Sequence, residues 1–331
     1  MKQTLAFITV LVLLISAITA ASYSTTTAIR KNPYADSFIL QQGAELPPLW
    51  LYYDTDDVNA RRWADFGARS SNALNIPFLN LCYGSIVACN GKHYRIEIIG
   101  GIGGIEERLG AAALPPGLHE PKRIGDAEYN WFRAAILEKF GGLWLDPASI
   151  CIKGFGELPK EKVLFFGTDK DQTYAGARGT AVPSLNAIWV PQAGHPIMKA
   201  WADAAYRRLV EKNTGAMARQ DAKWDYVAFA AAVAPASRQN EAASESAVVI
   251  PSAELSRNRR TGKRLQLEDL LATGQEGNLP FDVPGEAVYV PVPWKELRDR
   301  RAFGWFLRMS EAQIMASDII VRDLLMLSGR I

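Results

Sequence analysis

The sequence predicts an α/β domain in which short apolar strands alternate with helices. Apolar or alternating runs of strand length lie at residues 49–53, 94–99, 143–145, 162–167, 186–190 and 288–292. Between them, apolar residues recur at helical spacing, most clearly in residues 126–140 and from Pro196 onward. Strands that alternate with helices in this way are typical of a domain built around a largely parallel sheet.

Residues 126–153 carry the clearest local pattern. Asp126 begins an apolar helical face and is predicted to cap that helix, and Gly141 stands where a helix ends in the left-handed conformation. A short apolar strand follows, and Asp146 comes directly after it. Open α/β sheets bind ligands at the carboxyl ends of their strands, so Asp146 is a candidate site residue. A purely structural role, capping the turn that follows, is equally compatible with the sequence.

Composition limits the class of protein. The chain has 331 residues, 48% of them hydrophobic and 22% charged, which is typical of a globular protein. Its formal net charge is only +2, and the charges are mixed along the chain, so we expect no nucleic-acid partner. The sequence contains no internal repeat and no clear second domain.

The amino terminus differs from the rest of the chain. An uncharged run from Thr4 to Ala21 follows Lys2. As a helix it would span about 27 Å, close to the thickness of a thin bilayer. We therefore expect residues 1–22 to be a signal anchor or a cleaved signal peptide, followed by a stem at 23–46 and a catalytic domain at 47–331. The protein would be a single-pass membrane protein of the secretory pathway or cell envelope, or would be secreted after cleavage.

Two polar clusters follow predicted strands. The acidic residues at 54, 56 and 57 either contribute to a site or form a solvated turn. The glycines at 100–104 raise the possibility of a dinucleotide-dependent oxidoreductase. Glu106 occupies the position of the third glycine in that fingerprint, and Glu106 and Glu107 place negative charge where a pyrophosphate would bind. A glycine-rich turn is therefore the favoured interpretation.

Three other features each allow two interpretations. Cys82 and Cys89 can close a small disulfide loop in an oxidising compartment, which would leave Cys151 as a buried thiol. His195 at a helix start is either a base or, as we favour, a turn or cap residue. The basic residues within 257–264 either neutralise a phosphorylated donor or an acidic acceptor, or form a solvated loop, which is the usual case.

Residues 127–152 read AEYNWFRAAILEKFGGLWLDPASICI. The positions Arg133, Phe140, Gly141, Gly142, Trp144 and Asp146 make this stretch resemble the sugar-binding region of DXD-type glycosyltransferases. The resemblance is to the bacterial capsular polysaccharide synthesis proteins and the fungal initiating mannosyltransferase family. The run at 49–52 is similar to an early strand of the family, and Asn186 with residues 194–196 is similar to a later segment. The resemblance covers roughly residues 47–210.

The resemblance implies a GT-A-like nucleotide-sugar-binding fold with a mixed, mostly parallel sheet, preceded here by the N-terminal membrane helix. It implies transfer of a sugar from a nucleotide-sugar donor to a glycan or related acceptor, with retention at the anomeric carbon. The donor leaves as a diphosphate, whose developing charge a divalent cation (Mn²⁺ or Mg²⁺) can stabilise.

The resemblance also implies roles for individual residues. Asp146 would be a catalytic residue and the metal ligand, and Arg133 would pair with an oxygen of the sugar or diphosphate. Asn130 would hydrogen-bond sugar hydroxyls. Trp50 and Tyr52 would lie near the base or ribose of the donor, although a role in the core is equally compatible with their positions.

Two positions depart from the family pattern. Asn130 stands where the family usually has an aspartate, and Ala148 replaces the second aspartate of the DXD motif. Ser149, directly beside it, is the remaining polar candidate for contact with the donor. These departures keep an alternative open, in which the protein is a catalytically inactive relative that binds glycan or acts as a scaffold.

Overall fold

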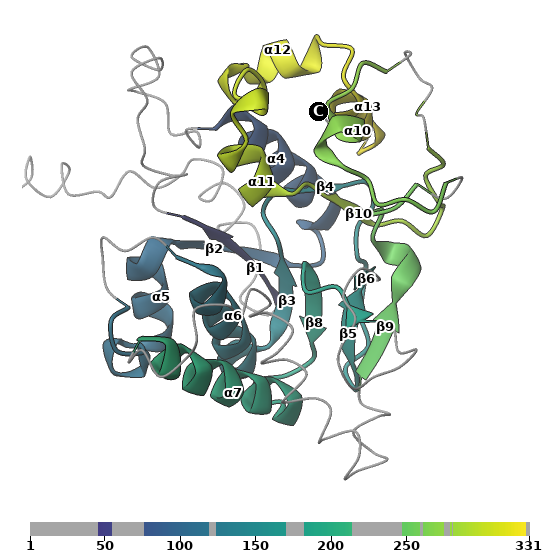
Figure 1. Ribbon diagram of the computed structural model, residues 1–331. Coiled ribbons are helices and arrows are strands. Elements are labelled where there is room, and N and C mark those ends of the chain that lie inside the picture. Colours follow the sequence, from purple (N-terminus) through teal and green to yellow (C-terminus); the bar gives the residue numbers. More distant parts are fainter. Residues whose placement is uncertain are drawn as a thin grey trace, which may run out of the picture.

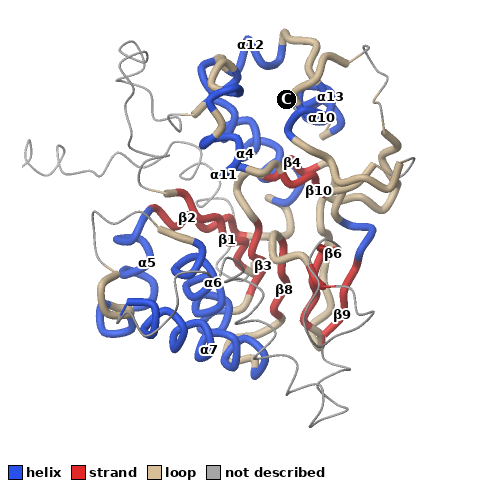
Figure 2. The backbone as a smooth tube through the Cα atoms, viewed as in Figure 1, coloured by secondary structure: helices blue, strands red, loops and turns tan. Residues whose placement is uncertain are grey.

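The computed structural model of the chain describes residues 46–54, 76–118, 124–169, 182–213, 247–258, 261–274, 279 and 281–328. Within these ranges a central sheet has helices on both faces, and a smaller part is formed by a two-stranded ribbon and C-terminal helices (Figures 1 and 2). The predicted membrane segment and the predicted stem as far as residue 45 lie outside the described residues. Of the helices that are described, none combines the length and the apolar character needed to cross a bilayer.

The central sheet has six strands in the order β2–β1–β3–β8–β5–β9. Strand β8 is antiparallel to both of its neighbours, whereas the pairs β2–β1, β1–β3 and β5–β9 are parallel. The sheet is therefore mixed and mostly parallel, which confirms the α/β class. The strands are β1 Pro48–Tyr53, β2 Arg95–Gly100, β3 Gly142–Leu145, β5 Val163–Phe166, β8 Ala187–Val190 and β9 Ala247–Ile250.

The chain changes its direction of winding at β1. After β1 it passes through α4 (Pro77–Asn90) to β2, and after β2 it passes through α5 (Gly101–Leu109) and α6 (Asp126–Phe140). It then enters β3 on the other side of β1. The gap between the carboxyl ends of β1 and β3 is therefore a topological switch point, the place where open α/β sheets bind ligands.

Side chains of β1 alternate between two cores, as the two-residue period of a strand requires. Leu49, Leu51 and Tyr53 belong to the core on the α4 face. Trp50 and Tyr52 belong to the core under α6 and α7 (Pro196–Asn213). Because both faces are covered, the strand is an unbroken apolar run rather than an alternating one.

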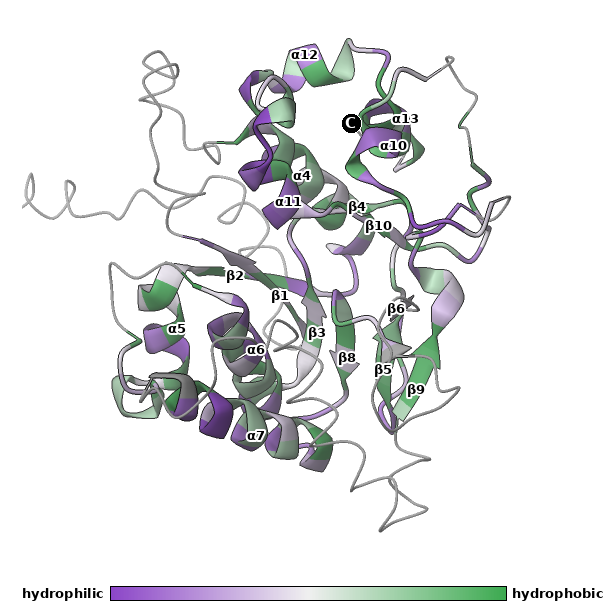
Figure 3. Cartoon of the chain, viewed as in Figure 1, coloured by the Kyte–Doolittle hydropathy of each residue, from purple (hydrophilic) through white to green (hydrophobic). Residues whose placement is uncertain are grey.

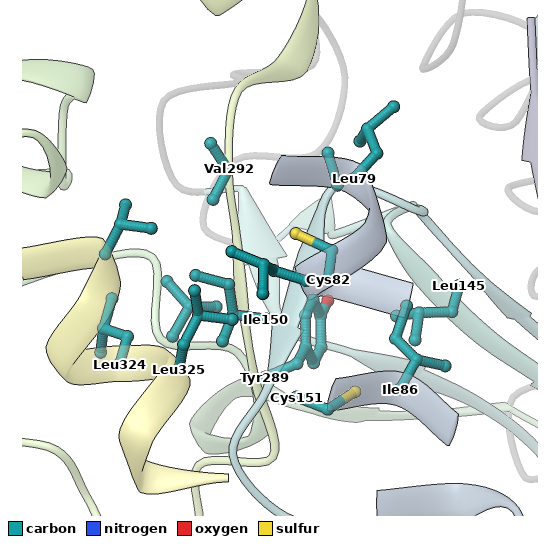
Figure 4. Close-up of a cluster of buried hydrophobic side chains, with 14 of the residues drawn as sticks. Leu79, Cys82, Ile86, Leu145, Ile150, Cys151, Tyr289, Val292, Leu324 and Leu325 are labelled. Carbon is teal, nitrogen blue, oxygen red and sulfur yellow. The ribbon is translucent and has the colours of Figure 1, made fainter. Parts of the chain in front are cut away.

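The core on the α4 face continues into the C-terminal part of the chain. There, β4 (Ser149–Cys151) pairs antiparallel with β10 (Tyr289–Pro291), and α13 (Ile320–Leu327) packs beside them. Figure 4 shows side chains from all of these elements in one cluster, including Leu79, Cys82, Ile86, Leu145, Ile150, Tyr289, Leu324 and Leu325. The remaining elements are β6 Thr168–Asp169, β7 Val182–Pro183, α10 Leu267–Leu270, α11 Trp294–Asp299, α12 Glu311–Met315 and short 3₁₀ turns at 111–113, 251–253, 301–303 and 306–308.

The predicted strands and the principal helices are present, with local corrections. Asp126 does not cap α6; it is the first helical residue, and Glu128 Oε2 accepts a hydrogen bond from the backbone N–H of Gly125 at 3.1 Å. The glycines at 101–104 form the first turn of α5 rather than a loop. That segment follows the edge strand β2 and lies away from the switch point.

Two short helices, α12 and α13, lie near the C-terminus. Ser310 caps the start of α12 in a capping box, since the Gln313 N–H donates to Ser310 Oγ at 3.2 Å and Gln313 Oε1 accepts from the Ser310 N–H at 2.8 Å. Helix α12 ends at Met315, because backbone groups of Asp318 and Ile320 form hydrogen bonds with the segment 272–274 and do not continue the helix. The carbonyl of Asp318 accepts from Gly274 at 2.6 Å, and the N–H of Ile320 donates to Ala272 at 3.1 Å.

The disulfide considered for Cys82 and Cys89 is absent, and all three cysteines are free thiols. Both residues lie on α4, two turns apart. That separation is about 10 Å along the helix axis, beyond the reach of a disulfide. The prediction was wrong because the intervening residues form a helix and not a loop. Cys151 is buried, as expected of the remaining thiol.

Gly142 allows β3 to approach β1 closely. Its φ is +95°, and a Cβ at this position would lie 2.4 Å from the carbonyl oxygen of Pro48 and 3.1 Å from Nε1 of Trp50. Only glycine fits this backbone conformation and this space together. Gly142 is thus required by the close contact between β1 and β3.

We predict that Gly142→Ala lowers the free energy of unfolding by roughly 3–5 kcal/mol, because left-handed strain adds to the clash with Pro48. Gly156→Ala is the matched control, since Gly156 has a φ of +67° but open space around it. That control should lose about 1–2 kcal/mol. Urea unfolding measures both values, and equal losses would show that the close approach contributes nothing.

Candidate functional site

A cavity of about 830 Å³ opens at the topological switch point. This volume is within the range of roughly 300–1,000 Å³ that is usual for small-molecule sites. Its floor comes from the carboxyl ends of β1 and β3 and from the start of α6. Its walls come from Ser256, Arg264 and Leu265 and from the segment 291–299. The cavity therefore lies where the switch-point rule places a ligand site.

Asp146 stands at the point where β3 ends and lines this cavity. Its backbone N–H donates to the carbonyl of Asn186 at 2.8 Å, and its Oδ1 accepts from the N–H of Ala148 at 3.0 Å. Its other carboxylate oxygen, Oδ2, makes no hydrogen bond to any residue that the structure describes. Asp146 therefore caps the turn and also presents an oxygen to the cavity.

Burial raises the pKa of the Asp146 carboxyl above its ordinary value. The hydrogen bond from Ala148 and the positive charge of Arg133 lower this pKa, and the nearby Glu254 carboxylate raises it further. Burial outweighs the stabilising contacts, so the protein itself compensates the ionised carboxylate poorly. A cationic or hydrogen-bond-donating ligand would supply the missing compensation.

Arg133 extends from the middle of α6 to the edge of the cavity. Its side chain is only 4% exposed, and its Nη1 donates to the carbonyl of Leu185 at 3.1 Å. The guanidinium carbon lies 5.2 Å from the ring centroid of Tyr129 and 5.3 Å from that of Trp201. Contacts of this kind favour a cation and hold the guanidinium in one place.

Tyr52 is a residue of β1 that lines the cavity. Its hydroxyl donates to Asp54 Oδ1 at 3.1 Å, and its ring packs 4.5 Å from the ring of Phe132, measured between centroids. Asp54 Oδ2 lies 3.9 Å from Nη1 of Arg298 on α11. Asp54, the acidic residue after β1, is thus part of the cavity wall, and Tyr52 combines a buried ring with a hydroxyl that bonds to this wall.

The opposite wall carries charges of both signs. Helix α11 is mostly hydrophilic (Figure 3), and its Lys295 forms an ion pair with Asp126 at 2.9 Å. Arg264 also lines the cavity, and it belongs to the basic cluster for which a solvated loop was the favoured interpretation. These side chains make the cavity suited to a polar, charged ligand.

Three of the predicted donor-binding residues, Trp50, Asn130 and Ser149, do not line this cavity. Trp50 is 2% exposed, and its Nε1 donates to the carbonyl of Gly141 at 2.9 Å. It precedes Tyr52 by one strand period, so it lies deeper in the sheet. Asn130 Oδ1 accepts from Trp201 Nε1 at 3.1 Å between α6 and α7. Ser149 lies fully buried in β4.

The structure brings together Tyr52, Arg133 and Asp146, and it adds residues that the sequence did not single out. Lys295 and Arg298 are far away in sequence, and no motif marks them. Asn186 had two available signals, its place at the start of a predicted strand and the similarity of its segment to a later segment of the family, but the sequence assigned it no role in the site. His195 takes the cap role favoured for it, since its Nδ1 accepts from the N–H of Ile197 at 3.3 Å.

The described residues around the cavity offer few ligands for a metal ion. Within the described part of the chain, no group of three or more histidine, cysteine or acidic side chains is arranged to hold a metal ion. Asp146 offers one carboxylate oxygen. A single protein carboxylate fits a hard divalent cation whose other ligands are substrate phosphates and water, as is common for Mg²⁺.

Comparison with known proteins gives distant similarities. No protein-family model matches the chain, and no curated protein sequence does either. The chain is similar to the PaToxG glycosyltransferase structure, with 14% identity, a TM-score of 0.36, and coverage of 65% of this chain and 79% of that one. A structure described as a transferase shows 12% identity, a TM-score of 0.29, and coverage of 56% and 89%. Similarity at this level establishes no activity.

We predict that Asp146→Asn raises the thermal unfolding temperature at pH 7.5. Asparagine keeps the acceptor for the Ala148 N–H and removes a charge that burial disfavours. Because the pKa of Asp146 is raised in the folded state, its destabilising effect is absent below the unfolded value of about 4, grows as pH rises above that value, and is complete above the folded value. The advantage of the variant should therefore vanish in acid. An Asp146→Asn protein that is less stable at pH 7.5 would contradict this electrostatic account.

Proposed function

We propose that this protein is a glycosyltransferase that moves a sugar from a nucleotide-sugar donor to a glycan or related acceptor, with retention at the anomeric carbon. The donor would occupy the cavity at the switch point. The alternating helices and strands, the mixed, mostly parallel sheet and the position of Asp146 are consistent with a GT-A-like fold. Domain limits of 1–22, 23–46 and 47–331, with an N-terminal anchor or cleaved signal, remain part of this proposal.

One observation carries the proposal. A carboxylate oxygen of Asp146 and the guanidinium of Arg133 line the same cavity, at the carboxyl ends of two parallel strands where the sheet changes its winding direction. Switch points of this kind bind nucleotides in open α/β sheets. The sequence around Asp146 and Arg133 independently resembles the sugar-binding region of the DXD-type enzymes.

The cavity residues fit the chemistry of sugar transfer. When the bond between the sugar and the diphosphate breaks, negative charge accumulates on the diphosphate. Arg133 can donate to its oxygens from a fixed, mostly buried position. A divalent cation (Mn²⁺ or Mg²⁺) held by Asp146 would supply further charge neutralisation when bound. We assign donor contact to Tyr52, Arg133 and Asp146, and not to Trp50, Asn130 or Ser149.

The alternative is a catalytically inactive relative that binds glycan, and the alanine at position 148 motivates it. A dinucleotide-dependent oxidoreductase has less support. The glycines considered for that role lie in α5 after the edge strand β2, and they do not line the cavity.

The proposal is tested with a panel of four nucleotide sugars: UDP-glucose, UDP-galactose, UDP-N-acetylglucosamine and GDP-mannose. Thermal shift with and without Mn²⁺ measures binding, and release of nucleoside diphosphate measures turnover. Stabilisation by at least one donor together with turnover is expected. Binding without turnover under every condition would favour the inactive alternative, and no binding at all would overturn the proposal.

We predict that Asp146→Ala lowers kcat for donor hydrolysis by about 100-fold or more, as loss of a transition-state contact does. The circular dichroism spectrum should stay unchanged. Asp203→Ala serves as the control, since Asp203 is exposed on α7 and pairs only with Lys199 in the described structure. Full activity of Asp146→Ala would remove Asp146 from the mechanism.

A further inference from the structure

Glu254 lies beside the cavity and has no part in the function proposed so far. Its Oε2 accepts from Ser184 Oγ at 2.5 Å and from Asn186 Nδ2 at 3.2 Å, and Tyr289 Oη lies 2.6 Å away. Gly167 leaves room for it, because a Cβ there would lie 2.6 Å from the Glu254 Cβ. Contacts on several sides therefore hold this carboxylate in one position.

The Glu254 carboxylate fixes the orientation of the Asn186 amide. A carboxylate oxygen in this position accepts hydrogen bonds, so the NH₂ end of the amide must face Glu254. The backbone of Asn186 is also engaged, since its N–H lies 3.4 Å from Ser184 Oγ and its carbonyl accepts from Asp146 at 2.8 Å.

One polar atom of Asn186 is then left for a ligand. Its Oδ1 makes no hydrogen bond to any described residue, and the residue lines the cavity. An amide oxygen accepts hydrogen bonds, so it is suited to a ligand that carries a donor group. The hydroxyls of a sugar are such donors.

We propose that Glu254 is a positioning residue that turns the Asn186 carbonyl oxygen toward the sugar of the donor, where it accepts a hydrogen bond from a sugar hydroxyl. This inference rests on the proposed function, because it assigns one side of the same cavity to the sugar. A site built to bond a hydroxyl rejects sugars that lack it, so Asn186 would contribute to donor specificity.

The orientation of the amide is tested without a ligand. Asn186→Asp places a carboxylate oxygen against Glu254, and it should lower the unfolding temperature at pH 7.5. Adding Glu254→Gln to that variant supplies an amide donor in place of the lost one, and it should recover most of the loss. The single variant Glu254→Gln is measured as well. If the decreases in unfolding temperature caused by Asn186→Asp and by Glu254→Gln simply add in the double variant, Asn186 does not face Glu254 as described and the inference falls.

A matched pair elsewhere in the chain controls for the chemistry of this swap. Asn80 Nδ2 donates to Glu311 Oε1 at 3.0 Å, and neither residue lines the cavity. Asn80→Asp combined with Glu311→Gln makes the same exchange there. It should leave the KM for the donor unchanged.

The role toward the sugar is tested by steady-state hydrolysis of the donor that the panel selects. Asn186→Leu removes the acceptor and should raise KM about 3- to 10-fold, the size of one hydrogen bond. Inhibition by the matching nucleoside diphosphate should stay unchanged. The combined Asn186→Asp, Glu254→Gln variant keeps an acceptor and should have a KM close to that of the wild type.

The outcomes separate the two proposals. An unchanged KM in Asn186→Leu, or an equal weakening of nucleoside diphosphate inhibition, overturns the sugar contact. Because the wild type still turns over the donor in that case, the proposed function stands. If the wild type neither binds nor hydrolyses any of the four nucleotide sugars, the proposed function fails and this inference fails with it.

Discussion

The turn after β3 connects the two parts of the molecule through hydrogen bonds, and the geometry of the cavity depends on it. On the sheet side, the N–H of Asp146 donates to Asn186 at 2.8 Å. On the other side, the carbonyl of Ala148 accepts from the N–H of Val292 at 2.9 Å, and Ser149 pairs with Pro291. The wall that carries α11 is thereby attached to the turn that carries Asp146. A change in this turn would move both walls of the cavity relative to each other.

This attachment brings together charges that are distant in sequence. Lys295 faces Asp126, and Arg298 faces Asp54, across the cavity entrance. The Lys295–Asp126 pair is largely exposed and contributes at most about 1 kcal/mol to stability, whereas the side chains of Arg298 and Asp54 are only 18% and 15% exposed. Their effect is to compensate those carboxylates locally. Asp146, by contrast, is partly buried and poorly compensated, so a ligand gains most from interacting with this carboxylate.

The sequence contained enough to predict the local elements but only part of the site. The run 49–53 and the stretch 126–146 are strands and a helix whose apolar pattern is local, and Asp146 and Arg133 belong to that same stretch. Trp50 was harder to place, because a buried strand gives no signal for depth along its axis. Lys295 and Arg298 depend on the pairing of β10 with β4, a long-range contact that no local pattern reports. The Cys82–Cys89 loop failed because a continuous helix separates the two thiols.

Ala148 shows why this chain has a single carboxylate at the end of β3. Its side chain is fully buried in the core beneath α4, among apolar residues that include Ile150 and Leu145. An aspartate at this position, in the same backbone conformation, would place a charge in that core, at a cost of several kcal/mol unless it were paired. The hydrogen bond from the Ala148 N–H to Asp146 also fixes the direction of the turn. Replacing the alanine with aspartate would therefore not rebuild a two-carboxylate metal site, and the protein's own positive charge at the cavity comes from side chains such as Arg133.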